Sequence, residues 1–108
     1  MLTENITPAA VVEKEHITNL VFPGDEVLRS QEEIAQRRAD AERGLLLGNG
    51  FTSKVSIHFR DAEGLRKVET TIWEVNDSSI GLKNNTYIPL HRIVKVEIQN
   101  ESLKYPNI

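Results

Sequence analysis

His91 and Arg92 are the neighbouring side chains best suited to bind a ligand, because they stand side by side in a predicted tight turn. A histidine next to a guanidinium can hold a phosphate or stack on a nucleic-acid base. The same pair can be structural, with Arg92 bound to a nearby carboxylate and His91 capping the turn. The sequence favours this second interpretation and leaves the first open.

Other basic side chains extend this candidate site. Lys54, His58 and Arg60 lie along one predicted strand, and Lys95 lies in the last one. Lys54 and Lys95 therefore join the histidine and arginine as candidate RNA contacts, for which we expect salt-dependent binding of short single strands. A solvated strand face has the same pattern, and this structural interpretation is the favoured one for the basic strip.

The histidines give no sign of a metal site. His16, His58 and His91 are far apart in the sequence, and none has a partner at the i,i+4 spacing. The chain has no cysteine, which excludes disulfides, thiolate zinc sites and cysteine nucleophiles. The glycine-rich residues 48–50 precede a predicted strand, which is the wrong order for a phosphate-binding loop. We expect neither a metal nor a cofactor.

Nothing in the sequence indicates catalysis. The acidic residues in and beside the predicted strands include Asp61, Glu69 and Glu74. No pattern brings two of them together or buries them enough to shift a pKa. The aromatic residues that offer a stacking face are Phe51, Phe59 and Trp73. In a chain with six aromatic residues we expect these three in the core, and we expect a protein that is not an enzyme.

The charges are distributed unevenly along the 108 residues. Residues 1–23 carry one basic against three acidic side chains, residues 24–44 carry four against six, and residues 53–99 carry seven against six. The strand region therefore has no field that would steer nucleic acid, and RNA binding needs a local patch. The chain has no apolar run of membrane-spanning length and no basic flank at its start, so we expect one cytoplasmic domain without membrane contact.

One helix is predicted from about residue 30 to Arg43. Ser30 and Glu33 have the spacing of a capping box, in which each side chain satisfies a free amide of the first turn. Gly44 is expected to end the helix, and residues 45–50 are expected to connect it to the strands.

From Lys54 onward, apolar and polar residues alternate with the period of a strand. The five predicted strands cover residues 54–60, 66–75, 80–83, 87–90 and 93–98. Within the second strand the alternation changes parity before Trp73, as a bulge or sharp bend requires. Asn84 and Asn85 are expected to form a two-residue hairpin turn, because asparagine tolerates positive φ.

The predicted fold is mainly β, with one N-terminal α-helix followed by a five-stranded antiparallel barrel. Short strands joined by tight turns curl into a barrel because closure removes exposed edges. Residues 31–99 resemble the SH3-like barrels, and within them the Sm-like proteins, in the leading helix, the bent second strand and residues 77–84 and 88–94. In the bacterial Sm-like RNA chaperone family a lysine-histidine pair before the last strand lines the RNA pore. His91 matches that histidine, and Leu90 stands in the lysine's place.

The N-terminal residues suggest a surface for association. Leu20, Val21 and Phe22 form an apolar run that is unsuited to a free tail. We expect residues 1–23 to form a segment with one short strand near 17–22, residues 24–100 to form the helix and barrel, and residues 101–108 to form a flexible tail. The leading hypothesis is a non-enzymatic binding or assembly module that forms homo-oligomers or binds a protein partner through this run and its strand edges. The alternative is a single-stranded RNA-binding protein that uses His91 and Arg92.

Overall fold

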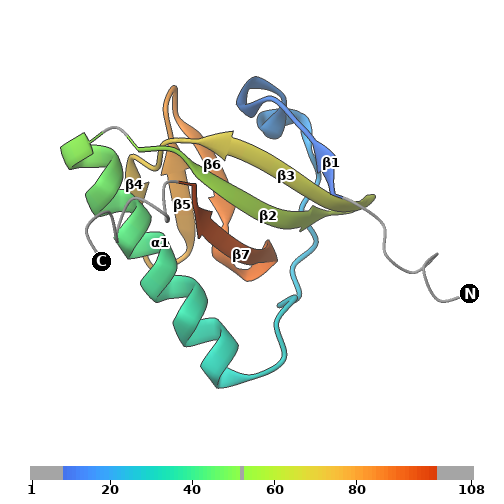
Figure 1. Ribbon diagram of the computed structural model, residues 1–108. Coiled ribbons are helices and arrows are strands. Elements are labelled where there is room, and N and C mark those ends of the chain that lie inside the picture. Colours follow the sequence, from blue (N-terminus) through green and yellow to red (C-terminus); the bar gives the residue numbers. More distant parts are fainter. Residues whose placement is uncertain (1–8, 52, 100–108) are drawn as a thin grey trace, which may run out of the picture.

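A computed structural model describes residues 9–51 and 53–99 of the chain. The fold is mainly β, with one long helix and two sheets (Figure 1). The first sheet has the spatial order β1-β3-β2-β7, with β1 at Ala10–Val11, β3 at Gly64–Thr70, β2 at Val55–Asp61 and β7 at Ile93–Ile98. The second has the order β4-β5-β6, with β4 at Glu74–Val75, β5 at Ser79–Leu82 and β6 at Thr86–Pro89. The helices are α1 at Gln31–Phe51 and two short 3-10 helices, η2 at Lys14–Asn19 and η3 at Leu90–Arg92.

The single closed barrel expected from the sequence is not found. The strands of the described residues form two separate sheets. The predicted strand over residues 66–75 is divided, because β3 ends at Thr70 and β4 begins at Glu74. The parity does not change before Trp73 as predicted, because Val68, Thr70 and Ile72 are buried and Trp73 continues the alternation as an exposed residue. It changes after Trp73, since Glu74 is also exposed and Val75 packs against the core. The bend carries the chain from one sheet into the other.

Both sheets contribute to one core. Val55, Ile57 and Phe59 of β2 have no exposed surface, and neither do Ile80 and Ile88 of the second sheet. The three β2 residues are spaced by two, which places them on one face of the strand, as the alternation in the sequence predicted. Each such side chain stabilises the fold by roughly 1.5–3 kcal/mol when it is buried.

Helix α1 lies against β7 and β4, along one side of the sheets (Figure 1). Its start is confirmed as a capping box, because Ser30 Oγ accepts a bond from Glu33 N at 3.0 Å and Glu33 Oε1 accepts one from Ser30 N at 3.4 Å. Its predicted end at Arg43 is wrong, since the helix continues through residues 44–50 to Phe51. No helix in residues 9–51 or 53–99 is long and apolar enough to cross a membrane.

Gly44 and Gly48 lie inside the helix, and they allow it to pack closely against the bend. A Cβ on Gly48 would lie 2.9 Å from the carbonyl oxygen of Ile72, and one on Gly44 would lie 3.0 Å from the Ile72 side chain. Only glycine allows the helix to approach the bend this closely. The two glycines are one helical turn apart and face the same neighbour, so the helix is held against the bend along that turn.

The N-terminal segment packs on the sheets, but its secondary structure differs from the one expected. Residues 17–22 do not form a strand: η2 occupies Lys14–Asn19, and its Ile17 is buried in the core. The strand lies earlier, where β1 pairs in parallel with β3. Val21 O accepts a bond from Ala62 N at 2.8 Å, which fixes the segment beyond η2. The tail predicted over residues 101–108 lies outside the described residues.

The predicted hairpin turn is found at the two asparagine residues, but it has three residues and not two, because Leu82 pairs with Thr86 and Lys83 also lies in the turn. Asn84 and Asn85 have φ values of 66° and 57°, between the antiparallel strands β5 and β6. This left-handed conformation is the one that asparagine accepts more readily than most residues.

Replacing Gly48 will test the close approach of helix and bend. We expect Gly48→Ala to lower the free energy of unfolding by about 1–3 kcal/mol, because the new methyl group meets backbone that cannot move aside easily. Gly50→Ala is the matched control in the same helix, since among the described residues no atom outside its chain neighbours and the helix backbone lies within 4 Å of the added Cβ. The control should be neutral or stabilising by up to about 1 kcal/mol. Urea unfolding followed by circular dichroism measures both, and equal losses would contradict the packing argument.

Candidate functional site

Arg92 is part of the framework of the fold. It is 6% exposed, and its Nη1 donates to Asp25 Oδ1 at 2.9 Å and to Asp25 O at 2.8 Å. Its Nε donates to Arg60 O at 3.0 Å. These bonds join the segment before the helix to β2, and they support the structural interpretation of this arginine.

His91 has the same role. Its Nε2 donates to Pro23 O at 3.0 Å, because a carbonyl oxygen can only accept. Its backbone oxygen accepts a bond from Val27 N at 2.9 Å. The histidine therefore holds the segment before the helix through both its ring and its backbone.

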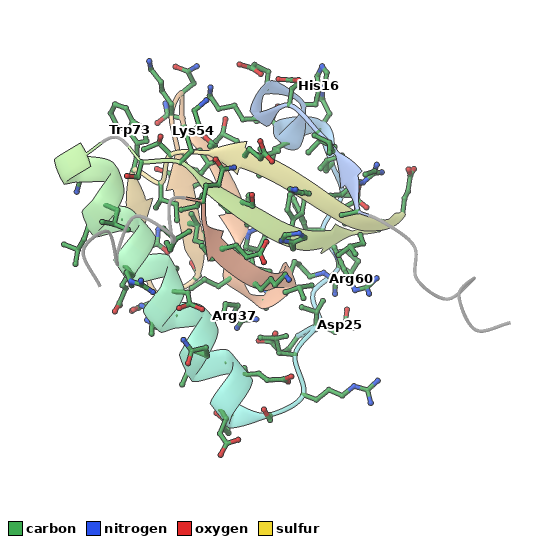
Figure 2. The ribbon with its side chains drawn as sticks, viewed as in Figure 1. His16, Asp25, Arg37, Lys54, Arg60 and Trp73 are labelled. Carbon is green, nitrogen blue, oxygen red and sulfur yellow. The ribbon has the colours of Figure 1, made fainter. Side chains whose placement is uncertain are left out.

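The basic groups around His91 are paired with acids. Arg37, 6% exposed, donates to Glu26 through Nη1 at 2.6 Å and through Nη2 at 2.9 Å, and it points from helix α1 toward the sheets (Figure 2). Arg38 donates to Asp77 at 3.3 Å. These residues line a pocket of about 490 Å³ beside His91, but each guanidinium faces a carboxylate. The pocket therefore presents little net positive charge to an anion.

The outward face of the first sheet is balanced in charge as well. The register places His58 beside Lys67 of β3 and Lys95 of β7. Lys67 lies 3.4 Å from Glu69, and Lys95 lies 3.3 Å from Glu97. Burial lowers the pKa of His58, the Glu97 carboxylate opposes this shift, and the two lysines reinforce it. The lowered pKa favours the neutral form of His58, and Lys95 belongs to an ion pair on this face.

The apolar run at residues 20–22 is largely used within the chain. Leu20 and Phe22 pack against the core, and the Phe22 ring lies 5.9 Å from that of Phe59. Val21 is 68% exposed. Of the three residues expected to form an association surface, the structure leaves one on the outside.

Lys54 lies at a cleft of about 380 Å³, between the last turn of helix α1 and the bend before β4. Lys14 and Lys83 also line it, and Glu69 is an acidic residue of its lining. Lys54 is far from Arg60, which lies toward the other end of β2, so the predicted basic strip does not form one surface (Figure 2). Instead, residues distant in sequence bring three lysines together. Lys14 is half-buried and lies 3.7 Å from Glu15, so Lys54 and Lys83 supply most of the local positive charge on a chain whose net charge is −3.

Trp73 stands at this cleft, and its expected place in the core is wrong. It is 57% exposed, and Lys83 Nζ lies 6.0 Å from the centre of its ring. Trp73 continues the alternation of Val68, Thr70 and Ile72, which are buried, and the bend after it returns Val75 to the core. Phe59 is in the core as expected, and the side chain of Phe51 lies outside the described residues.

Trp73, Lys83 and Lys14 are the site residues that sequence reasoning missed. The alternation of Val68, Thr70 and Ile72 was a usable signal for Trp73, because its continuation places residue 73 on the outward face. Lys14 and Lys83 come from the N-terminal segment and from a hairpin turn, and no spacing in the sequence links them to Lys54. Only the tertiary fold brings the three together.

The described residues contain no group of three histidine, aspartate or glutamate side chains that could hold a metal ion. Comparison with known proteins gives no match to a family model, to a curated protein or to a solved structure. The function is therefore argued from the cleft itself.

The pairing of Arg37 with Glu26 predicts a dependence of stability on pH. The hydrogen bond from Arg37 holds the pKa of Glu26 below its ordinary value, although burial acts in the opposite direction. Its carboxylate therefore stabilises the folded chain above an unfolded-state pKa of about 4.3, and this contribution is lost as the pH falls through the lower, folded pKa. We expect Glu26→Gln to destabilise by about 1–3 kcal/mol at pH 6 and by less at pH 3.

Urea unfolding at a series of pH values measures this difference. Glu32→Gln is the control, because Glu32 is an exposed carboxylate in the first turn of α1, and it should change stability by no more than about 0.5 kcal/mol. A Glu26→Gln deficit that stays constant from pH 6 to pH 3 would contradict the linkage.

Proposed function

We propose that this chain is a non-enzymatic module that binds single-stranded nucleic acid at the cleft of Trp73, Lys54, Lys83 and Lys14. The observation that carries the proposal is an exposed indole placed among three lysines. Lysines attract backbone phosphates, and an exposed aromatic ring stacks on an unpaired base. RNA binding was the alternative function predicted from the sequence. The proposal retains that function but places its site at the opposite end of helix α1 from His91 and Arg92.

The geometry favours a flexible single strand over a duplex. A base in a duplex is stacked on its neighbours and offers no free face to Trp73, whereas a base in a single strand does. The Lys83 ammonium lies close to the indole, so a phosphate bound there would bring its own base to the ring. Base stacking on an aromatic side chain is worth about 1–3 kcal/mol.

The order of the strands is the basis for a further proposal about the fold. Apart from β1, which pairs in parallel with β3 at the edge of the first sheet, the strands run in the order β7-β2-β3 and then β4-β5-β6. This is the path of five antiparallel strands with a bent second strand, as the resemblance to SH3-like and Sm-like barrels implies. We therefore propose a relationship to these barrels for the arrangement of strands. The site argument stands without it, because it depends on the cleft.

A binding role fits the carboxylates better than catalysis does. Asp61 accepts bonds from two amides of its own turn and from Arg66 at 3.1 Å. Glu69 pairs with Lys67, and Glu74 accepts a bond from Tyr87 at 3.1 Å. Each acid has a structural partner.

Association with itself or with a protein partner is the second proposed function. Val21 and Val11 support it, because they are 68% and 69% exposed in the docked N-terminal segment. Sedimentation velocity tests it directly. A single monomer mass up to millimolar concentration would exclude self-association.

Binding of an oligonucleotide should quench the fluorescence of Trp73, the one tryptophan of the chain. We expect a labelled twelve-nucleotide single strand to bind, with Trp73→Ala weakening the affinity by about fivefold or more through lost stacking. Lys54→Gln and Lys83→Gln should each weaken it and reduce the salt dependence, which for three lysines has a logarithmic slope of about −2. Fluorescence anisotropy measures both effects.

Lys95→Gln is the matched control, because Lys95 is an exposed lysine paired with Glu97 on the outward face of the first sheet. It should bind like the wild-type chain. An RNA strand and a DNA strand of the same sequence are titrated in parallel. Binding of either strand supports the proposed function of the cleft. The absence of any anisotropy change at 50 mM salt for either strand would exclude this function.

A further inference from the structure

Tyr87 is a second exposed aromatic residue on the sheet next to Trp73. It lies on β6 and is 43% exposed. The register pairs Tyr87 with Gly81 of β5, and Gly81 with Glu74 of β4. Residues paired directly across antiparallel strands project from the same face, so Tyr87 and Glu74 lie on either side of Gly81 on one face of the second sheet.

Gly81 lets these two side chains meet above it. A Cβ at this position would lie 2.9 Å from Tyr87 Cε2 and 3.1 Å from Glu74 Cβ, so the space over the glycine is filled by its neighbours. Tyr87 Oη donates to Glu74 Oε1 at 3.1 Å, and Asn76 Nδ2 donates to Glu74 Oε2 at 3.3 Å. The ring and the carboxylate are therefore held in place before any ligand arrives, which reduces the entropy lost on binding.

This face adjoins the cleft. Trp73 immediately precedes Glu74, and its amide donates to Gly81 O at 2.9 Å. Neighbouring strands are about 4.8 Å apart, so the backbones of Glu74 on β4 and Tyr87 on β6, the outer two of three strands, are separated by roughly 10 Å. Trp73 precedes β4 by one residue. Exposed aromatic residues of one sheet are a known arrangement for stacking two or three bases of one single strand.

We propose that Tyr87 is the second stacking position of the nucleic-acid site, for the base next along the strand from the one on Trp73, and that Glu74 makes this position prefer a base with an exocyclic amino group. The proposal rests on the function proposed above. A carboxylate can accept a bond from cytosine N4, whereas uracil presents an oxygen at the same place. Each oxygen of Glu74 can accept a second bond in addition to those from Tyr87 and Asn76. Its negative charge also keeps phosphates away, so the base and not the backbone faces the sheet here.

The test compares one nucleotide with a longer strand, using the fluorescence of Trp73 as the common signal. Uridine 5′-monophosphate has one base and occupies one stacking position at a time, so Tyr87→Ala should weaken its binding less than it weakens binding of a longer strand. The same variant should weaken binding of a six-nucleotide cytidine strand by about fivefold or more. Tyr87→Phe keeps the ring and should retain most of the affinity. Cytidine strands should bind the wild-type chain more tightly than uridine strands, and Glu74→Leu should remove this preference.

The outcomes separate this proposal from the function on which it depends. If neither ligand quenches Trp73, the proposed function fails. If both bind but Tyr87→Ala binds the long strand as the wild-type chain does, the cleft stands and the second position is overturned. A loss of mononucleotide affinity equal to that of the long strand would show that Tyr87 acts through the fold, and it would also overturn the proposal. Thermal unfolding of each variant confirms that the comparison is made on folded protein.

Discussion

The contact between helix α1 and the bend at residues 71–72 determines where the candidate ligand-binding side chains lie. Gly44 and Gly48 bring the helix onto the bend at a separation that a methyl group would not permit. Ile72 is buried at the bend, and Trp73 faces outward, next to the last helical turn. A helix that stood further away would widen the cleft. The two glycines thus shape the site because their lack of a side chain allows close backbone packing.

Arginines and lysines have different roles in this chain, and the difference follows from their chemistry. Arg37 and Arg92 are buried, and each planar guanidinium bonds a carboxylate and backbone carbonyls at once. A guanidinium has several N–H donors in one rigid plane, which suits acceptors that are fixed in position inside a fold. Lys54 and Lys83 are exposed, and within the described residues neither forms an ion pair. A hydrated ammonium on a flexible stem suits a mobile phosphate, so the fold is held by arginines while the cleft presents lysines.

Local patterns in the sequence predicted the structure correctly where interactions between residues close in the sequence determine it. The period-two alternation marked β2 and β7, the Ser30 and Glu33 capping box marked the start of the helix, and Asn84 with Asn85 marked a hairpin turn. The prediction failed where one residue type serves two physical purposes. Gly44 can end a helix or allow close packing, and only the position of Ile72 distinguishes these. His91 and Arg92 were ambiguous for a similar reason, because their partners Pro23 and Asp25 lie more than sixty residues earlier in the chain.

The candidate site also depends on a balance between charge and stacking. Three lysines on a chain with a net charge of −3 give little long-range attraction, so a ligand must be held by contacts at short range. An exposed tryptophan contributes such a contact to any base, because every base has a π face. Phosphate contacts and Trp73 alone would then bind single strands with little preference among sequences. Discrimination requires a polar group fixed beside a stacked base, and Glu74, held by Tyr87 and Asn76, is placed to supply it.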